Sequence, residues 1–456
     1  MSLRRASLLA CGLARALAVG TTIACAACDP TSTKAPPTEG AEASPNASIL
    51  PGPRADEAPP ASATTASPTP SEEPPDAGPR GMLADSAGRL VSPEPGPPTP
   101  LRPDRPLPLD PLAHGELPGI TLQMSITWRD VPLPPKAPEV SAEGIAKAAA
   151  ATALQLIVDM AEEGRTRVVL SSRAFPLPPR TEIRAREDRL GSVLLWPDGD
   201  RYRPIAPGAL RALFGERRAD VTPLSSGLIE KEEKAKPPKV EGLPDGLNAR
   251  VVHMESSFGA LVLSLVPITE AGKGGAPLCR ILVELAGIEA TSAICKSTEV
   301  PLRASYAWKE GGGFDVEAKV YTRRTDLIPA DLAVPPPQAT YTAGELPLVP
   351  VGVFLTKDEL AVFRTKVVAA AAPPPDAPGE GFFARNDTEL LQYLLLDGVP
   401  VVAVPPHEER FLVGPLGGTY MAQWRTFLGD HIEPAAPVVL PGRLQIGKRT
   451  EADAGP

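Results

Sequence analysis

The residues of this sequence best suited to chemistry form a short cluster of imidazole and carboxylate groups. His407, Glu408 and Glu409 are consecutive between two predicted strands, and His431 follows the next turn. Imidazole and carboxylate groups suit zinc, and together they can also act as an acid–base pair. The alternative is a solvated hairpin loop whose side chains only face water. Because nothing else nearby completes a site, we expect the solvated loop.

A second pair of carboxylates, Asp198 and Asp200, flanks Gly199. Such a pair could bind calcium or serve a glycosidase, but Trp-Pro-Asp-Gly-Asp is also the chemistry of a tight turn. The sequence has no G-x-S-x-G, H-E-x-x-H or dinucleotide-binding motif, and residues 272–275 lack the Ser or Thr of a phosphate loop. We therefore predict no catalytic residue, no metal site and no cofactor, and a protein that is not an enzyme.

Three large aromatic residues, Trp308, Tyr420 and Trp424, lie on alternating faces of predicted strands. A row of aromatic rings can form a platform for carbohydrate. Packing into a core explains the same positions more simply. We expect the core.

The chain opens in the order of an export signal. Arg4 and Arg5 precede an apolar run that is too short and too rich in alanine to span a membrane, and small residues then lead to Cys28. Ala26-Ala27-Cys28 resembles the lipobox of bacterial lipoproteins, which implies a signal peptide over residues 1–27 and a diacylglycerol anchor on Cys28. Two alternatives stay open: cleavage before Cys25, and ordinary secretion after a site such as Ala24-Cys25-Ala26.

Two cysteines, Cys279 and Cys295, remain once the signal and the anchor are set aside. In an oxidising compartment this predicts one disulfide. It would close a loop of about sixteen residues and stabilise the fold by about 3 kcal/mol. Two buried free thiols are the alternative.

The charge and the hydropathy exclude two classes of function. The formal net charge is −9, and no basic stripe is present, so we expect no nucleic-acid partner. No second apolar run reaches the ~20 residues of a membrane span. We predict an exported protein of the cell envelope, held by its lipid anchor on the periplasmic face or at the cell surface.

Composition divides the chain after the signal. Residues 28–118 are rich in Pro, Ala and Ser and predict a disordered tether. Residues 119–340 predict an α+β domain, either one unit or two similar halves with a break near 225–245. Residues 345–447 predict a helix followed by a small β-sandwich, and residues 448–456 a polar tail.

In the central domain, alternating apolar residues predict an antiparallel sheet. Helical periodicity over residues 141–163 predicts a long helix, which we expect to cover that sheet. A short helix is expected over residues 277–286, and a solvated loop over residues 230–239. Further strands are expected at residues 120–128, 167–175, 181–187, 193–196 and 251–266, with a hairpin at residues 302–320 that turns at Gly311-Gly312-Gly313.

In the C-terminal part, Thr356 to Glu359 is a capping box that opens a helix. Two strands about Asp397-Gly398 follow, then a strand at residues 417–427 and a closing strand at residues 437–447. Leu396-Asp397-Gly398, Gly418-Thr419-Tyr420 and Gly429 resemble the PEGA-type β-sandwich of bacterial envelope proteins. That resemblance covers residues 385–447 and implies display at the cell surface without enzymatic chemistry.

Residues 325–336 of the central domain resemble the end of LolA-type half-barrels, which hold lipid against a covering helix. Three hypotheses follow. The first is a non-catalytic, lipid-anchored envelope protein that scaffolds or binds another envelope protein, a polysaccharide or a lipid. The second is a carrier of lipid or another apolar ligand, which requires an apolar cavity. The third is an envelope hydrolase built on His407, Glu408 or the Asp198/Asp200 pair.

Overall fold

The structure is a computed structural model, and it describes residues 98–132, 139–216, 223–309, 311–344, 352–367 and 377–447. It also gives the backbone of two short paired strands, β1 (Leu83–Ala84) and β2 (Leu90–Val91). The predicted signal peptide, Cys28, most of the predicted tether and the polar tail lie outside the described residues.

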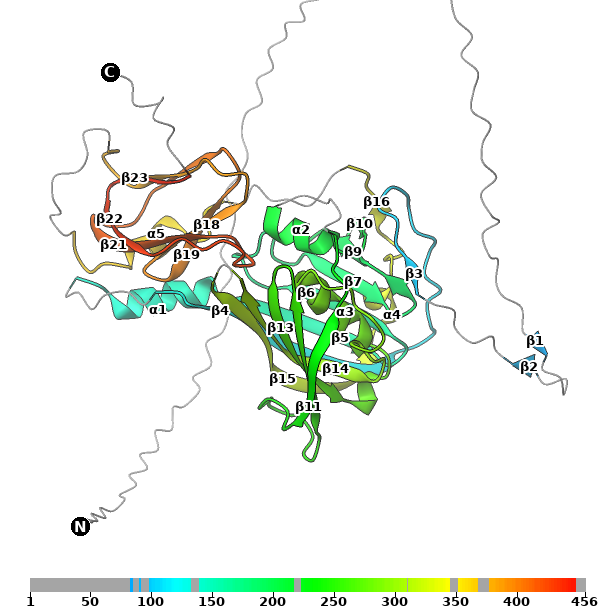
Figure 1. Cartoon of the computed structure of the whole chain (residues 1–456). Helices are drawn as coiled ribbons and strands as arrows, with labels where there is room; N and C mark the ends of the chain where they lie inside the picture. Colours follow the sequence, from blue (N-terminus) through cyan, green and yellow to red (C-terminus); the bar gives the residue numbers. More distant parts are fainter. Residues whose placement is uncertain are drawn as a thin grey trace, which may run out of the picture. The chain divides into compact units, whose positions relative to one another are not determined.

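One twelve-stranded sheet forms the central domain (Figure 1). Neighbouring strands are antiparallel except for the last pair, β10 and β16. The sheet runs without a break through residues 225–245, where a division into two halves was considered. In spatial order its strands are β11 (Leu228–Ala235), β12 (Ala249–Ser256), β13 (Gly259–Pro267), β14 (Glu299–Trp308), β15 (Gly313–Leu327), β4 (Leu117–Arg129), β5 (Leu154–Ala161), β6 (Arg165–Leu170), β7 (Glu182–Arg186), β9 (Ser192–Leu195), β10 (Arg201–Ile205) and β16 (Thr340–Tyr341).

The sheet curves around helix α3 (Gly275–Leu285), as Figure 1 shows. This helix contacts β14 in one half of the sheet and β6 and β7 in the other. Ten of its eleven residues are buried. A helix that is apolar on almost every side needs cover all round, and a curved sheet provides it. Helix α2 (Ala209–Glu216) packs beside α3. The remaining short helices of this domain are η1 (Thr269–Ala271) and α4 (Pro329–Leu332).

The long helix expected over residues 141–163 is wrong in its second half. Helix α1 ends at Ala151, and Leu154–Ala161 is strand β5. Every second residue of this strand is buried: Leu154, Leu156, Val158 and Met160. This alternation is the pattern of a strand with one face on the core. The same residues also fit a helical stripe, and the pairing of β5 between β4 and β6 decided between the two.

The helix expected to cover the sheet was also misidentified, because α3 and not the helix at Ser141 lies against it. Helix α1 (Ala142–Ala151) contacts strand β19 and helix α5 of the C-terminal part instead. It buries only the small residues Gly144 and Ala148, which suits close packing on a flat surface and not the filling of a curved sheet.

The charged loop expected at residues 230–239 is largely a strand. β11 pairs with β12 along its length and forms one edge of the sheet. Its side chains are almost all exposed, and charged side chains are what a solvated edge strand requires. The run of charged residues therefore indicates an edge strand of the sheet and not a loop.

The predicted tether reaches too far. Residues 98–118 pack on the central domain, where Leu101 and Asp110 are buried. Strand β3 (Thr99–Pro100) pairs with β8 (Arg189–Leu190). The leucines scattered among the prolines of this stretch supply enough apolar surface to hold it against the sheet.

The C-terminal part contains two sheets that share one core. A single closing strand was predicted at residues 437–447, but Pro441 divides it between the two sheets. The four-stranded sheet has the order β19 (Val399–Val404), β18 (Gln392–Leu396), β21 (Gly418–Arg425) and β22 (Ala436–Leu440), and the three-stranded sheet the order β20 (Glu409–Leu412), β17 (Phe382–Asn386) and β23 (Gly442–Ile446).

Several local predictions are confirmed. Helix α5 (Lys357–Ala361) begins with the complete Thr356/Glu359 capping box. The hairpin of β18 and β19 turns at Asp397 and Gly398, which both have positive φ as a two-residue hairpin turn requires. The hairpin of β14 and β15 turns immediately before Gly313.

Candidate functional site

The residues first considered for chemistry, His407, Glu408 and Glu409, are exposed on the surface of the C-terminal part. His407 is exposed, and its Nε2 lies 3.0 Å from Glu389 Oε1. Glu408 pairs with Arg410, and Glu409 accepts a 2.6 Å hydrogen bond from Arg443. Each carboxylate is thus paired with a guanidinium on the sandwich surface, as in a solvated loop.

Asp198 and Asp200 are exposed in the turn between β9 and β10. The Gly199 amide donates to the Trp196 carbonyl at 2.9 Å, which closes that turn, and Asp200 lies 3.6 Å from Arg201. Within the described part of the chain, no group of three or more His, Cys, Asp or Glu side chains could hold a metal ion.

The three aromatic side chains are core residues, as predicted. Tyr420 is fully buried, and Trp308 and Trp424 are at most 6 % exposed. The Tyr420 hydroxyl donates to the Leu416 carbonyl at 2.7 Å, and the Arg364 guanidinium lies 4.2 Å from the centre of its ring. They offer no surface to a sugar.

Among the hollows that the described residues form, an open cleft of about 350 Å³ on strands β12 to β14 and another of about 620 Å³ have the volume of a ligand site. The cleft of about 620 Å³ lies beside helix α3. Its walls come from the start of β3, the turn between β7 and β9, helix α3 and the loop that follows α3. The lining side chains include Asp188, Arg280, Thr291, Ser292 and Lys296.

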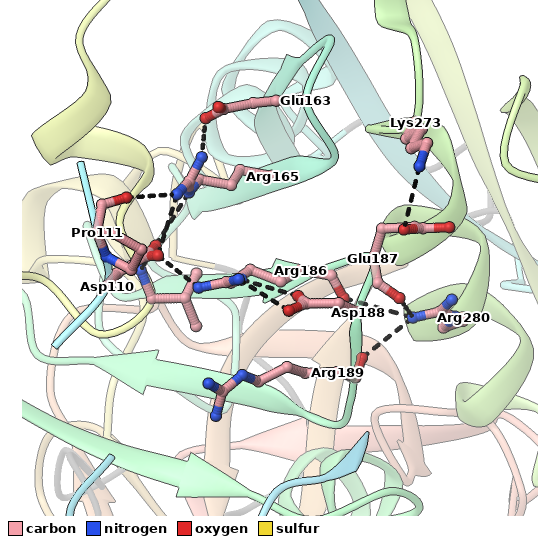
Figure 2. A network of polar contacts seen from close by, with 11 residues as sticks. Asp110, Pro111, Glu163, Arg165, Arg186, Glu187, Asp188, Arg189, Lys273 and Arg280 are labelled. Atoms are coloured by element: carbon pink, nitrogen blue, oxygen red, sulfur yellow. Dashed lines mark hydrogen bonds and ion pairs between the residues drawn. The ribbon is translucent and has the colours of Figure 1, made fainter. Parts of the chain in front are cut away.

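A network of arginine and carboxylate side chains holds one wall of the cleft (Figure 2). Asp110 is buried and accepts hydrogen bonds from Arg165 Nε at 2.9 Å, from Arg165 Nη2 at 3.0 Å and from Arg186. Arg186 also donates from Nε and Nη2 to the two carboxylate oxygens of Asp188, each at 2.8 Å. Of the two acidic residues that line the cleft, Asp188 is therefore neutralised by Arg186, and Glu187 lies 4.0 Å from Lys273.

Arg280 of helix α3 fixes the same wall from the other side. Its Nη1 donates to the carbonyl oxygens of Glu187 at 2.7 Å and Arg189 at 3.0 Å. Burial lowers the pKa of Arg280 from its usual range. Lys296 is exposed and makes no ion pair with any residue that the structure describes. The unpaired charge at the cleft is thus positive.

The predicted disulfide between Cys279 and Cys295 is formed, with an S–S distance of 2.01 Å and a Cα–Cα distance of 5.6 Å. Cys279 lies on α3, and Cys295 lines the cleft. The bridge ties the loop of residues 290–297 to the helix that the sheet encloses. The floor and one wall of the cleft are therefore joined covalently.

A second hollow lies between α3 and the curved sheet. It is lined only by apolar side chains and holds about 40 Å³ of open space, close to what one or two water molecules fill. Ligand pockets measure about 300–1,000 Å³. The hollow therefore has the apolar lining that a carrier requires, but its volume is too small for an apolar ligand.

Two buried carboxylates, Asp110 and Glu284, were not predicted from the sequence. Asp110 lies in a proline-rich stretch that was assigned to the tether. Glu284 on α3 accepts a 3.2 Å hydrogen bond from the Gly208 amide, and burial raises its pKa to about 7. A lone carboxylate in the apolar run of residues 281–285 was the signal that could have revealed it.

The residues of the PEGA resemblance have structural roles in the sandwich. Asp397 Oδ1 accepts a 2.9 Å hydrogen bond from the Met421 amide, which fixes the hairpin turn against β21. Burial raises the pKa of Asp397, although the Arg364 guanidinium acts in the opposite direction. Gly429 packs so closely on the Trp308 ring that a Cβ there would lie 2.9 Å from it.

No helix within the described residues is long and apolar enough to cross a membrane. No protein-family model and no curated protein matches this chain. Among solved structures, the chain is similar to an outer membrane lipoprotein-sorting protein domain from Vibrio parahaemolyticus. The two are 12 % identical with a TM-score of 0.20, and the match covers 47 % of this chain and 89 % of that domain. At this TM-score the likeness carries no conclusion about function.

Proposed function

We propose that this protein is a non-catalytic, lipid-anchored component of the cell envelope that binds another envelope component in the cleft beside the disulfide. The observation that carries this proposal is the contrast between the two hollows. The cleft has the volume of a ligand site, about 620 Å³, whereas the space under α3 has about 40 Å³.

The fixed walls and the polar lining of the cleft support a binding role. One wall is set by the arginine network and another by the disulfide, so little ordering is required when a partner binds. Thr291, Ser292 and Lys296 offer hydroxyl groups and one unpaired cation. Such groups suit a polar or anionic partner, such as a protein loop or a polysaccharide.

Photo-crosslinking in living cells tests this proposal. A photoreactive amino acid replaces Ser292 in the cleft, and a matched variant carries it at Glu380, which is exposed in the C-terminal part. We expect an adduct from position 292 that is absent from position 380 and weakened by Lys296→Glu. The same adducts from both positions, or none from position 292, would contradict the proposal.

The C-terminal sandwich is proposed to be PEGA-like and to present the central domain at the cell surface. Its two sheets with a shared core and the fixed Asp397-Gly398 turn support this. The anchor at Cys28 is proposed from the sequence alone.

A carrier of lipid or another apolar ligand is the second candidate. The wholly apolar lining under α3 favours it. Its small volume means that this function requires an opening of the central domain. Lipid extraction from protein isolated from native membranes, followed by mass spectrometry, tests the carrier function directly.

A further inference from the structure

The turn that links β21 to β22 leaves its own sandwich and enters the core of the central domain. Phe427 and Leu428 are at most 3 % exposed and belong to the apolar cluster of the twelve-stranded sheet. Both side chains line the 40 Å³ space under α3. We call residues 426–430 the plug turn.

Phe427 is the centre of a group of aromatic rings. Its ring centre lies 5.5 Å from that of Phe214 on α2, 5.7 Å from Phe175, 5.6 Å from Tyr393 and 6.0 Å from Trp128. Phe175 and Phe214 also line the apolar space. The plug turn therefore fills one end of the space between sheet and helix.

An ion pair ties the plug turn to helix α2. Arg211 Nη2 lies 2.7 Å from Asp430 Oδ1, and the Arg211 side chain is only 4 % exposed. The Arg211 guanidinium is held between the rings of Phe258 and Trp308, at 4.2 and 4.7 Å from their centres. Arg211 is thus fixed in place, and Asp430, which is 35 % exposed, is the partner that can leave.

The turn is preformed and would move as one piece. The Thr426 amide donates to the His431 carbonyl at 2.9 Å, and the Gly429 amide donates to the Thr426 carbonyl at 3.1 Å. These hydrogen bonds lie within residues 426–431, so withdrawal of the plug turn together with His431 breaks neither of them.

The position of the plug turn in the central domain also carries an unfavourable contribution to the free energy of folding. Arg425 precedes the plug turn and is fully buried, with its guanidinium 4.4 Å from the centre of the Trp128 ring. Its Nη1 and Nη2 have no hydrogen-bond partner among the described residues. Its Nε donates to the Thr426 carbonyl at 3.4 Å. A buried guanidinium with two of its nitrogens lacking partners is unfavourable, which reduces the net stability of the docked state.

We propose that the plug turn is a removable stopper of an apolar binding space under α3, with Asp430 and Arg211 as its latch. The occupant admitted on withdrawal is an apolar chain such as a lipid acyl chain, because the lining has no polar group that could receive a head group. This proposal rests on the second candidate function, the carrier, and adds its regulation.

The test compares the wild-type chain with Asp430→Asn, which keeps the shape of the side chain and removes its charge. Asp387→Asn is the matched control, because Asp387 pairs with Arg385 at 2.7 Å on the outer sheet of the same sandwich. Binding is measured with the fluorescent apolar probe 1-N-phenylnaphthylamine and by competition with palmitate. Hydrogen exchange of the peptide that contains residues 425–432 reports withdrawal of the turn.

We expect Asp430→Asn to bind the probe at least about fivefold more tightly than wild type, with faster exchange of that peptide and unchanged behaviour of the control. Leu428→Ala, which shortens the stopper, should also raise probe affinity. Faster exchange without tighter binding would overturn the binding space. Tighter binding by Leu428→Ala with no effect of Asp430→Asn would overturn the latch.

The experiments distinguish a failure of the carrier function from a failure of the stopper proposal. If Asp430→Asn binds the probe but protein from native membranes yields no lipid, the stopper is real and the chain does not carry lipid. If lipid copurifies but neither variant changes probe binding, the ligand enters by another route and the stopper is wrong.

Discussion

Asp110 and Arg165 form a buried pair, with Arg165 Nε and Nη2 donating to the two carboxylate oxygens at 2.9 and 3.0 Å. They lie 55 residues apart in the chain. The pair fastens the segment that follows the proline-rich stretch to strand β6.

Asp110→Asn should destabilise the protein by about 3 kcal/mol, because it removes the buried anion that Arg165 and Arg186 share and leaves each with only a partly exposed carboxylate, Glu163 or Asp188. Urea unfolding followed by circular dichroism measures this loss. Asp104→Asn, an exposed position in the same segment, is the control and should leave the unfolding midpoint unchanged. Equal midpoints for Asp110→Asn and wild type would show that the segment contributes nothing to stability.

Replacing both cysteines, Cys279→Ala with Cys295→Ala, should lower the free energy of unfolding by about 3 kcal/mol, since the unfolded chain then gains the freedom that the bridge removes. Wild type in a reducing agent should show the same loss, which separates the loss of the bridge from the change of side chains. A loss in the double variant alone would point to packing instead.

Glu284 should make stability depend on pH. Burial raises its pKa from 4.5 to about 7, so the folded protein keeps a proton that the unfolded chain has released. Stability therefore falls as pH rises from 4.5 to 7, by about 3 kcal/mol in total. Glu284→Gln removes that fall and keeps an oxygen for the Gly208 amide. Unfolding measured at pH 5 and pH 8 should show a smaller difference in the variant. If both proteins lose the same stability between these values, Glu284 is not responsible.

Cys28→Ala should abolish the lipid anchor. We expect the variant to leave the membrane fraction while its disulfide-containing domain stays folded. Fractionation, with mass spectrometry of the mature N-terminus, measures both results. An N-terminus that begins at Cys25 would instead select the alternative cleavage site, and an unchanged membrane fraction would contradict the anchor.

The sequence predicted the local features well because each depends on neighbouring residues. The capping box at Thr356, the Asp397-Gly398 turn and the hairpin at Gly311–Gly313 are set by side chains a few positions apart. Cysteine count and compartment likewise predicted the pair Cys279 and Cys295.

The errors all concern long-range packing. Leu154 to Met160 fits either a helix or a strand, and pairing with β4 and β6 chose the strand. Residues 230–235 have the composition of a loop, and their pairing with β12 makes them a strand. Asp110 is held in the folded domain by hydrogen bonds from Arg165 and Arg186, which are distant in the sequence and could not be predicted as its partners.

The sequence by itself determined the Cys279–Cys295 disulfide and many of the strands, since these depend on composition and short-range order. It predicted an α+β fold, whereas the described residues are mostly strands with few helices. Tertiary structure alone decided which helix the sheet encloses, how small the space under α3 is, and that Phe427 of the C-terminal part fills its end. The reason is physical: a cavity or an interdomain contact arises between surfaces hundreds of residues apart, and no local pattern records the volume left between them.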